Sequence, residues 1–209
     1  MVQCNKNILG GTSLSIRTAT VERKTAETAI KLVLNIDGTG KGVIDSGIGF
    51  FDHMLNLLTA HGLFDLTLAC DGDLEVDGHH SIEDIGIALG EAFKKAIGNK
   101  AGIRRYASFY LPMDEALVLV ALDFSGRPFL VYDGGDMAPM IGGFDTELTE
   151  EFLRAFAVNA GLTLHVKVMY GTNSHHKVEA IFKGLGHALR EALEKDPRVD
   201  GIPSTKGML

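Results

Sequence analysis

Residues 77–97 read DGHHSIEDIGIALGEAFKKAI, and residues 173–193, 96 positions later, read NSHHKVEAIFKGLGHALREAL. Each stretch contains two adjacent histidines and a glutamate four residues after the first of them. Sliding the chain against itself by 96 residues aligns 65–97 with 161–193 without a gap, and several leucine, glycine and alanine positions then coincide. Such self-similarity is typical of an internal duplication, so we expect two related halves.

The apolar pattern predicts the same order of elements in both halves. For the first half we expect strands at 28–36, 43–45 and 66–70 and helices at 50–61 and 79–97. For the second half we expect strands at 104–111, 115–124, 128–132 and 162–170 and helices at 147–160 and 175–195. Each half is therefore expected to run strand, strand, strand, helix, strand, helix.

The ends and apolar faces of the helices predict the layers of the fold. Gly62 and Gly161 suit the left-handed position that closes a helix, and Pro197 cannot continue the last one. Because each helix must bury its apolar face, we expect an α+β fold with the helices packed between two four-stranded sheets. The expected units are a tail at 1–14, halves at 15–98 and 99–196, and a C-terminal segment at 197–209. The residues expected inside the first half's helices are Phe51, Met54, Leu55, Leu58, Ile82, Ile85, Leu89, Ala92, Phe93 and Ala96.

The composition is that of an ordinary globular protein. Its 209 residues are 45% hydrophobic, enough for a sizeable core, and no stretch approaches the ~20 apolar residues of a membrane span. A net charge of −7 argues against a nucleic-acid-binding surface, which carries a basic excess. Two cysteines, Cys4 and Cys70, give no framework of disulfides, which fits a reducing compartment. We therefore expect a cytoplasmic protein with neither a membrane nor a nucleic-acid partner.

The spacing of the histidines suggests metal binding. Adjacent helical residues point about 100° apart, whereas residues four apart lie on one face. His79 with Glu83, and His175 with Glu179, are therefore natural pairs of metal ligands, and the second histidine of each pair, His80 or His176, is left for a different ion or a different subunit. Imidazole with carboxylate suits Mn, Fe, Co, Ni or Zn. His53 could add a ligand, and His61 follows it two turns later on roughly the same face.

Other interpretations of these residues are open at this point. Histidine and acidic residues are common at solvated helix starts, where they cap the helix or interact with its dipole. Ser81 and Asp84 could form a capping box, which would start the helix at Ser81 and loosen the geometry of His79 and Glu83. His165 and His187 lie in apolar stretches and are expected to be core or surface histidines. The recurrence of both histidines and the glutamate in one frame favours the metal interpretation.

Four segments resemble one enzyme family. FFDHMLNLLTAHG (50–62), DGHHSIEDIGIALGEA (77–92), NSHHKVEAIFKGLGHALREA (173–192) and PSTKG (203–207) are similar to imidazoleglycerol-phosphate dehydratase of histidine biosynthesis, in its monofunctional form. The resemblance runs from about residue 15 onward. It implies a duplicated fold like that of ribosomal protein S5 domain 2 and two Mn²⁺ per active site. It further implies a large octahedral homo-oligomer of 24 subunits with active sites between subunits.

The same resemblance implies roles for individual residues. Glu27 would be the acid/base beside the substrate. Position 151 departs from many relatives, which have histidine before the corresponding phenylalanine, whereas this chain has Glu151. The implied metal ligands are His53, His79, His80, Glu83, Glu151, His175, His176 and Glu179, of which His53, Glu83 and Glu179 are also counted as catalytic groups. The implied substrate and phosphate ligands are Glu27, His61, Arg105, Arg127, Lys183, Ser204, Thr205 and Lys206.

The implied reaction removes water from imidazole glycerol phosphate to give imidazole acetol phosphate. The proton to be lost lies on a carbon with no adjacent carbonyl, so an electron reservoir is required. Our hypothesis is that two cations hold the substrate's ring as imidazolate, which expels hydroxide and gives a diazafulvene whose C–H is acidic enough for Glu27. Two other functions use similar ligands: a dinuclear metallohydrolase of a small phosphorylated substrate, and a metal-storage protein with closed coordination.

Overall fold

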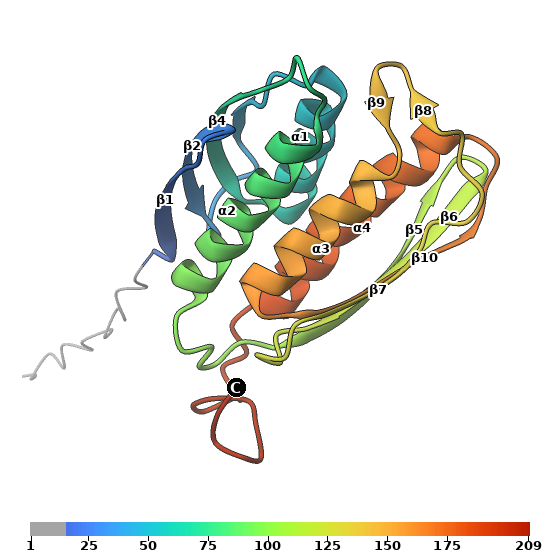
Figure 1. Cartoon of the computed structure of the whole chain (residues 1–209). Helices are drawn as coiled ribbons and strands as arrows, with labels where there is room; N and C mark the ends of the chain where they lie inside the picture. Colours follow the sequence, from blue (N-terminus) through green and yellow to red (C-terminus); the bar gives the residue numbers. More distant parts are fainter. Residues whose placement is uncertain (1–15) are drawn as a thin grey trace, which may run out of the picture.

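The computed structural model describes residues 16–209, and the predicted tail at 1–14, with Cys4, lies outside them. The first half forms β1 (Thr18–Lys24), β2 (Thr28–Asn35), β3 (Gly42–Asp45), α1 (Gly49–Gly62), β4 (Asp65–Gly72) and α2 (His79–Ile97), as Figure 1 shows. The second half forms β5 (Tyr106–Met113), β6 (Ala116–Asp123), β7 (Phe129–Asp133), α3 (Leu148–Ala160), β10 (Thr163–Tyr170) and α4 (Ser174–Leu193). The predicted order is confirmed in both halves.

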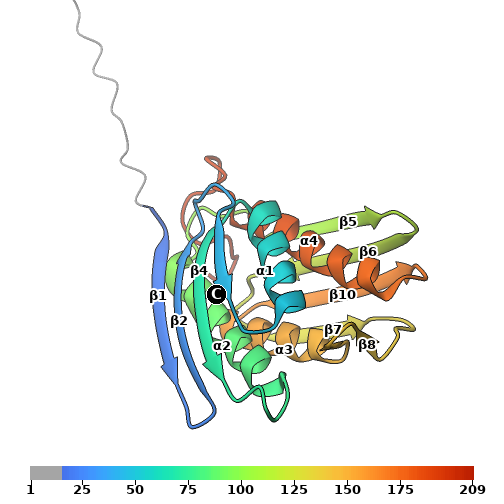
Figure 2. The same ribbon diagram turned by 90° about the horizontal axis from the view of Figure 1, so that it is seen from above.

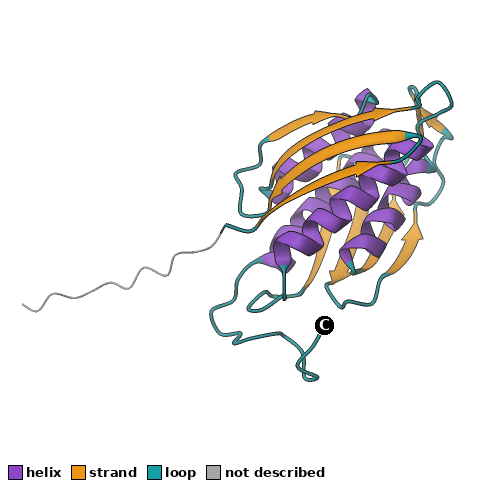
Figure 3. Cartoon of the chain, turned by 60° about the vertical axis from the view of Figure 1, so that its left-hand side comes forward, coloured by secondary structure: helices purple, strands orange, loops and turns teal. Residues whose placement is uncertain are grey.

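Two four-stranded sheets enclose the four helices. The strand orders are β1-β2-β4-β3 and β5-β6-β10-β7, and in each sheet the third strand of its half, β3 or β7, runs parallel to its neighbour. Figures 2 and 3 show the helices as a layer between the two sheets. The α+β sandwich expected from the sequence is therefore confirmed, and the core residues predicted in α1 and α2 are all buried.

Equivalent positions of the two halves are not separated by 96 residues throughout. α1 is followed by left-handed Leu63 and α3 by left-handed Gly161, which lie 98 positions apart. The connection from strand to helix spans residues 73–78 in the first half and 171–173 in the second, so the 96-residue frame is restored only in α2 and α4. The ungapped alignment of 65–97 with 161–193 is thus wrong before these loops. In the 98-residue frame, His53 on α1 corresponds to Glu151 on α3.

The closing residue of α1 differs from the prediction. Gly161 does close α3 with φ 67°, but Leu63 rather than Gly62 takes the left-handed position after α1, with φ 56°. Gly62 is needed for space instead, because a Cβ there would lie 2.2 Å from the ring of Phe64. The predicted left-handed position of Gly62 is therefore wrong, and glycine is required there by close packing and not by backbone conformation.

Repeated glycines bring the helices together in pairs. A Cβ on Gly90 of α2 would lie 2.7 Å from the carbonyl oxygen of Phe156 on α3, and one on Gly186 of α4 would lie 2.6 Å from that of Leu58 on α1. The two contacts are related by the internal repeat, because Gly90 is equivalent to Gly186 and Phe156 is equivalent to Leu58. The helices therefore pack as α2 with α3 and α1 with α4.

Three features differ from the prediction. Strand β1 (Thr18–Lys24) lies where no strand was predicted. Residues 140–145 form a short hairpin of β8 (Met140–Ile141) and β9 (Phe144–Asp145) before α3. The last helix ends at Leu193, two residues before the predicted end, so Pro197 is not the residue that stops it. Within residues 16–209 the structure has no helix with the length and apolar character of a membrane span.

Candidate active site

The first ligand group consists of His53, His175 and Glu179. One ligand atom from each lies within 4.8 Å of the others. Glu179 Oε2 is 3.1 Å from His175 Nε2 and 3.6 Å from His53 Nε2. His175 and Glu179 are one turn apart on α4, and His53 reaches them from α1, which packs beside it. The pairing predicted from the four-residue spacing is therefore present, with His53 beside it.

The carboxylate of the first ligand group is buried and held in its charged form. Glu179 is 7% exposed. Burial acts to raise the pKa of Glu179, but the hydrogen bond and charge of Lys183 together with His175 hold this pKa below its ordinary value. The group thus presents two imidazoles and an anionic oxygen, a donor set that fits a divalent transition metal.

The second ligand group consists of His79, Glu83 and Glu151. α2 begins at His79, whose N–H donates to Asp77 Oδ1, so the alternative start at Ser81 is excluded. Glu151 stands on α3 in the place that His53 has on α1. Within residues 16–209 these three side chains do not converge as closely as the first ligand group does. The second group therefore has the right elements, but its ligand atoms are spread further apart.

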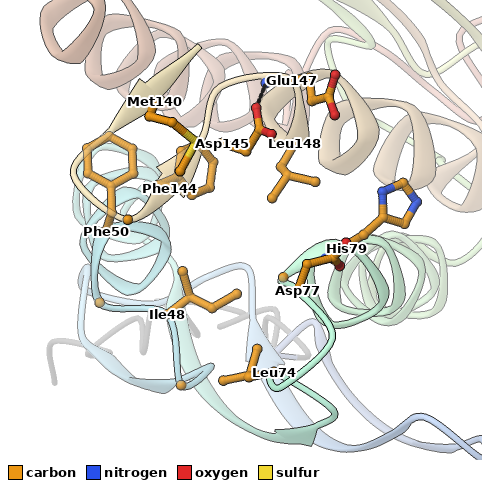
Figure 4. A pocket seen from close by; sticks show the side chains of 14 residues that line it. Ile48, Phe50, Leu74, Asp77, His79, Met140, Phe144, Asp145, Glu147 and Leu148 are labelled. Atoms are coloured by element: carbon orange, nitrogen blue, oxygen red, sulfur yellow. Dashed lines mark hydrogen bonds between the residues drawn. The ribbon is translucent and has the colours of Figure 1, made fainter. Parts of the chain in front are cut away.

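A pocket of about 540 Å³ has His79 of the second ligand group in its lining. Figure 4 shows His79 on one side of it and Phe50 on the other, with Ile48, Leu74 and Leu148 along its walls. Phe50 meets the ring of His175 edge-on at 5.2 Å. The pocket therefore adjoins His79 of the second ligand group and Phe50, which touches His175 of the first.

His80 and His176 point away from these groups toward other carboxylates. His80 Nδ1 donates to Asp73 Oδ2 at 2.9 Å, and His176 Nδ1 donates to Glu115 Oε2 at 2.7 Å. These hydrogen bonds raise the pKa of both histidines.

Glu27 lies in the turn between β1 and β2, with its carboxylate 3.7 Å from His80 Nε2. The Glu27 side chain is exposed, but the turn between β1 and β2 is held in place by hydrogen bonds. Thr25 Oγ1 accepts from the N–H of Glu27, and buried Asp84 on α2 binds Arg23 at 2.7 Å and the hydroxyl of Thr28. These hydrogen bonds and the ion pair place the carboxylate of Glu27 next to the histidine pair of α2.

His61 lies far from the first ligand group. It is at the last turn of α1, two turns beyond His53, where its Nδ1 is 3.2 Å from His187 Nε2. His187 in turn stacks on Phe109 with ring centroids 4.4 Å apart. In one chain this places His61 roughly 12 Å along the helix from His53, at the usual rise per residue.

Most of the predicted phosphate ligands gather at the opposite end of the helices. Arg105 is buried, binds Asp123 through two nitrogens, and donates from Nη1 to the carbonyl of Pro203 in the C-terminal segment. The same segment folds back so that Leu209 lies against Gly126, beside exposed Arg127. Arg105, Arg127 and the segment with Ser204, Thr205 and Lys206 are therefore neighbours, and Figure 1 shows this segment beyond the end of the helix layer opposite the β8–β9 hairpin. Lys183 is the exception, because it pairs with Glu179.

The two ends of the candidate site are far apart in one chain. The N–H of Arg105 donates to the carbonyl of Ala192 at the end of α4, whereas His175 stands at the start of that helix. At ~1.5 Å per residue, these two ends of α4 lie roughly 25 Å apart. Sequence reasoning gave no sign of this separation, because residue types do not reveal which end of a helix a loop meets.

Three carboxylates of the site were missed. Asp73 and Glu115 hold His80 and His176, and Asp84 holds the turn of Glu27. Asp73 and Glu115 lie in non-equivalent loops, so the internal repeat could not reveal them. Their only signal is an acidic residue in a short loop beside the site.

Comparisons with known proteins show the family of the chain. A family model described as imidazoleglycerol-phosphate dehydratase matches residues 46–189, more than half of the chain. The curated imidazoleglycerol-phosphate dehydratase of Acetivibrio thermocellus is 60% identical over 189 residues, covering 90% of this chain and 97% of the relative. The chain belongs to the imidazoleglycerol-phosphate dehydratase family. The relative from Caldanaerobacter subterraneus is 61% identical and covers 93% of this chain and 100% of its own.

Solved structures of the imidazoleglycerol-phosphate dehydratase family share this fold. The Staphylococcus aureus enzyme has a TM-score of 0.78 at 38% identity, over 86% of this chain and 99% of that one. The Pyrococcus furiosus enzyme, solved in complex with (S)-C348, has the same TM-score and identity over 90% of this chain and 100% of its own. The chain is thus a dehydratase of histidine biosynthesis, as its resemblance implied.

Proposed function

We propose that the chain dehydrates imidazole glycerol phosphate to imidazole acetol phosphate with two divalent metal ions per active site, Mn²⁺ by preference. The first ligand group, with two imidazoles and a buried carboxylate within 4.8 Å of one another, is the observation that carries the proposal. A second ion would be held by Glu151, His79 and Glu83. Because Glu151 replaces an imidazole by a carboxylate, the second group has the harder ligands, which suits Mn²⁺ among the transition metals.

Each active site would combine residues of different copies of the chain. The substrate is an imidazole ring, a three-carbon chain and a phosphate, roughly 10 Å long at ordinary bond lengths. A molecule of this size cannot reach from His175 to Arg105, since these lie at opposite ends of α4. We therefore assign the ligand groups to one copy and the phosphate-binding residues around Arg105 and the C-terminal segment to another.

An apolar surface supports self-association of this kind. The outer face of the second sheet exposes large side chains from three of its strands, whereas the outer face of the first sheet is mostly threonine and charged residues. Exposed apolar patches of this sort are typical of protein interfaces. The residues concerned are Tyr106, Tyr110, Phe129, Val131, Met169 and Tyr170. They are consistent with the 24-subunit assembly that the family resemblance implies, which remains part of the proposal.

Bound metal would supply positive charge to the substrate's ring nitrogens and so favour the ring anion. The chain's own residues do the rest. Arg105, Arg127 and Lys206 hold the phosphate, for which guanidinium groups offer paired donors and lysine a point charge. Glu27, exposed and held beside His80 by its turn, takes the proton from the second carbon of the side chain, which adjoins the carbon that loses hydroxide. In this hypothesis the substrate passes through a diazafulvene, and the enol that follows becomes the ketone.

The test is to incubate the Mn²⁺-loaded protein with imidazole glycerol phosphate and to identify the product by mass spectrometry. We expect one water to be lost while the phosphate is retained. Release of inorganic phosphate would instead support the metallohydrolase, and an unchanged substrate with tightly bound metal would support the storage protein.

A further inference from the structure

His80 and His176 are each held by a hydrogen bond from the ring to a carboxylate, and the two carboxylates come from different loops. His80 Nδ1 is 2.9 Å from a carboxylate oxygen of Asp73, in the loop between β4 and α2. His176 Nδ1 is 2.7 Å from a carboxylate oxygen of Glu115, in the turn between β5 and β6. Both contacts are made through Nδ1, and both leave the other ring nitrogen, Nε2, without a hydrogen bond inside the described residues.

A carboxylate decides which nitrogen of an imidazole carries the proton. An ionised carboxylate can only accept hydrogen bonds, so the Nδ1 atoms of His80 and His176 must each carry a hydrogen. In the neutral ring Nε2 is then the unprotonated nitrogen, which is the form that binds a metal. The nearest other carboxylates, Glu27 at 3.7 Å from His80 Nε2 and Asp114 at 3.8 Å from His176 Nε2, stand beyond hydrogen-bonding distance. In their neutral form both rings therefore have a free lone pair on Nε2.

The two carboxylate oxygens of Glu115 accept hydrogen bonds from different groups. Oε1 accepts the N–H groups of Thr172 at 3.0 Å and Asn173 at 2.7 Å, just before α4 begins. Oε2 accepts from His176. The backbone bonds fix where the carboxylate stands, so the second oxygen reaches His176 at a set angle. Asp73 is anchored too, because its N–H donates to the carbonyl of Glu27 at 3.2 Å.

The comparison with Glu27 shows that the two hairpin turns have diverged. Glu27 is in the turn between the first two strands of its half, as Glu115 is in the second half. Glu27 faces Nε2 of its histidine and makes no hydrogen bond to it, whereas Glu115 faces Nδ1 and is bound on both oxygens. The turn of the first half thus holds Glu27, whose carboxylate is available for proton transfer. The turn of the second half holds Glu115, whose carboxylate is hydrogen-bonded to the ring of His176.

We propose that Asp73 and Glu115 are positioning residues, which fix the tautomer and orientation of His80 and His176 so that each Nε2 completes a metal site of another copy of the chain. This inference rests on the proposed function, in which the ligand groups of one copy leave their ions incompletely bound. Partners of this kind typically change metal affinity by about 10- to 100-fold.

The sharpest test replaces Glu115 by glutamine. One end of the amide can still accept the backbone N–H groups, but its NH₂ then faces His176 Nδ1 and favours the opposite tautomer, in which Nε2 carries the hydrogen. The metal-free protein is titrated with Mn²⁺, and free Mn²⁺ is measured by its electron paramagnetic resonance signal. We expect Glu115→Gln to weaken one of the two Mn²⁺ sites about 10- to 100-fold and to leave the other unchanged.

Asp73→Ala should weaken the other site in the same way. Glu75→Gln, an exposed glutamate two residues from Asp73 that makes no hydrogen bond among the described residues, is the matched control and should bind Mn²⁺ as the wild type does. Wild-type affinity at both sites in Glu115→Gln would overturn the proposal.

A double-mutant cycle separates positioning from a general effect on folding. If Glu115 acts through His176, then Glu115→Gln should not weaken Mn²⁺ binding further in a His176→Ala background. The same fold-loss in both backgrounds would show that Glu115 acts on the loop and not on the ring, and would also overturn the proposal. Metal titration needs no turnover, so a wild-type protein that fails to dehydrate the substrate would count against the proposed function alone.

Discussion

His53 Nε2 and Glu179 Oε2 lie 3.6 Å apart on adjacent helices of opposite halves of the chain. They meet because α1 approaches α4 closely at Gly186, where the carbonyl of Leu58 leaves no room for a side chain. The geometry of the ligand group thus depends on helix packing two turns away from it.

Gly186→Ala should therefore destabilise the protein, although glycine to alanine usually stabilises a helix by about 1 kcal/mol. A Cβ there would lie 2.6 Å from the Leu58 carbonyl oxygen, so α1 must move and we expect a loss of about 1–3 kcal/mol. Chemical denaturation measures it. Gly184→Ala in the same helix meets a side-chain methyl of Val120 at 3.0 Å, which can shift, and should cost less. Equal effects of the two variants would contradict this role for Gly186.

Replacing His53 by alanine should remove one ligand of the first ligand group and lower the metal content. We expect elemental analysis to show loss of about one of the two ions, with the overall fold retained, because His53 is exposed. His165→Ala, an exposed histidine on the outer face of β10, is the control and should keep both ions. An unchanged metal content in His53→Ala would refute the assignment of this ligand.

Glu27→Gln should keep metal and substrate binding but lower turnover by about 10²- to 10⁴-fold, as expected for an acid/base. The loss should appear in kcat and not in KM. Glu22→Gln, on the adjoining strand and equally exposed, is the matched control. Turnover within a few-fold of wild type would exclude Glu27 as the proton acceptor.

The pair of His61 and His187 should make stability sensitive to acid. Burial lowers the pKa of both rings, and Arg190 adds to the effect on each, as Lys183 does on His61. A histidine in the unfolded chain has a pKa of about 6.5, so below this pH the unfolded chain binds protons more readily than the folded one. The stability of the fold is therefore full above this pH and decreases as the pH falls. Thermal unfolding between pH 8 and pH 5 measures this.

His187→Gln should flatten that dependence relative to the wild type, because one of the two lowered groups is gone. His165→Gln removes an exposed histidine and should leave the slope as it is. His80 and His176, whose pKa values are raised, act in the opposite direction but are present in all three proteins and cancel in the comparison. A steeper loss in His187→Gln would contradict the assignment.

The sequence predicts the helices and ligand pairs well because both depend on local periodicity. α2 begins and ends at the predicted residues, and the four-residue spacing does place His175 beside Glu179. What it did not predict depends on loop lengths and on contacts between particular side chains. The two-residue shift of β4 and β10 relative to the helices that follow them arises in a loop length, and the role of Gly62 depends on Phe64 across a turn. Asp73 and Glu115 carry no repeated pattern at all.

The separation of His175 from Arg105 is the clearest case of this limit. Both were expected in one active site, and both belong to segments that the family resemblance covers. The structure places them at opposite ends of α4, which is why we propose that the site combines residues of different copies of the chain. Nothing in the spacing of these residues indicates which copy supplies which group.

The most direct test of this account is complementation between two inactive variants. His175→Ala damages the first ligand group, and Arg127→Ala damages the phosphate-binding end. The two proteins are dissociated by removing metal, mixed, and reassembled with Mn²⁺ before dehydration of imidazole glycerol phosphate is measured. If ligand groups and phosphate ligands come from different copies, some mixed sites contain both intact parts, and activity should return well above either variant alone. A mixed assembly, verified by mass, that stays as inactive as its parents would show that each chain builds its own site and would contradict the central claim.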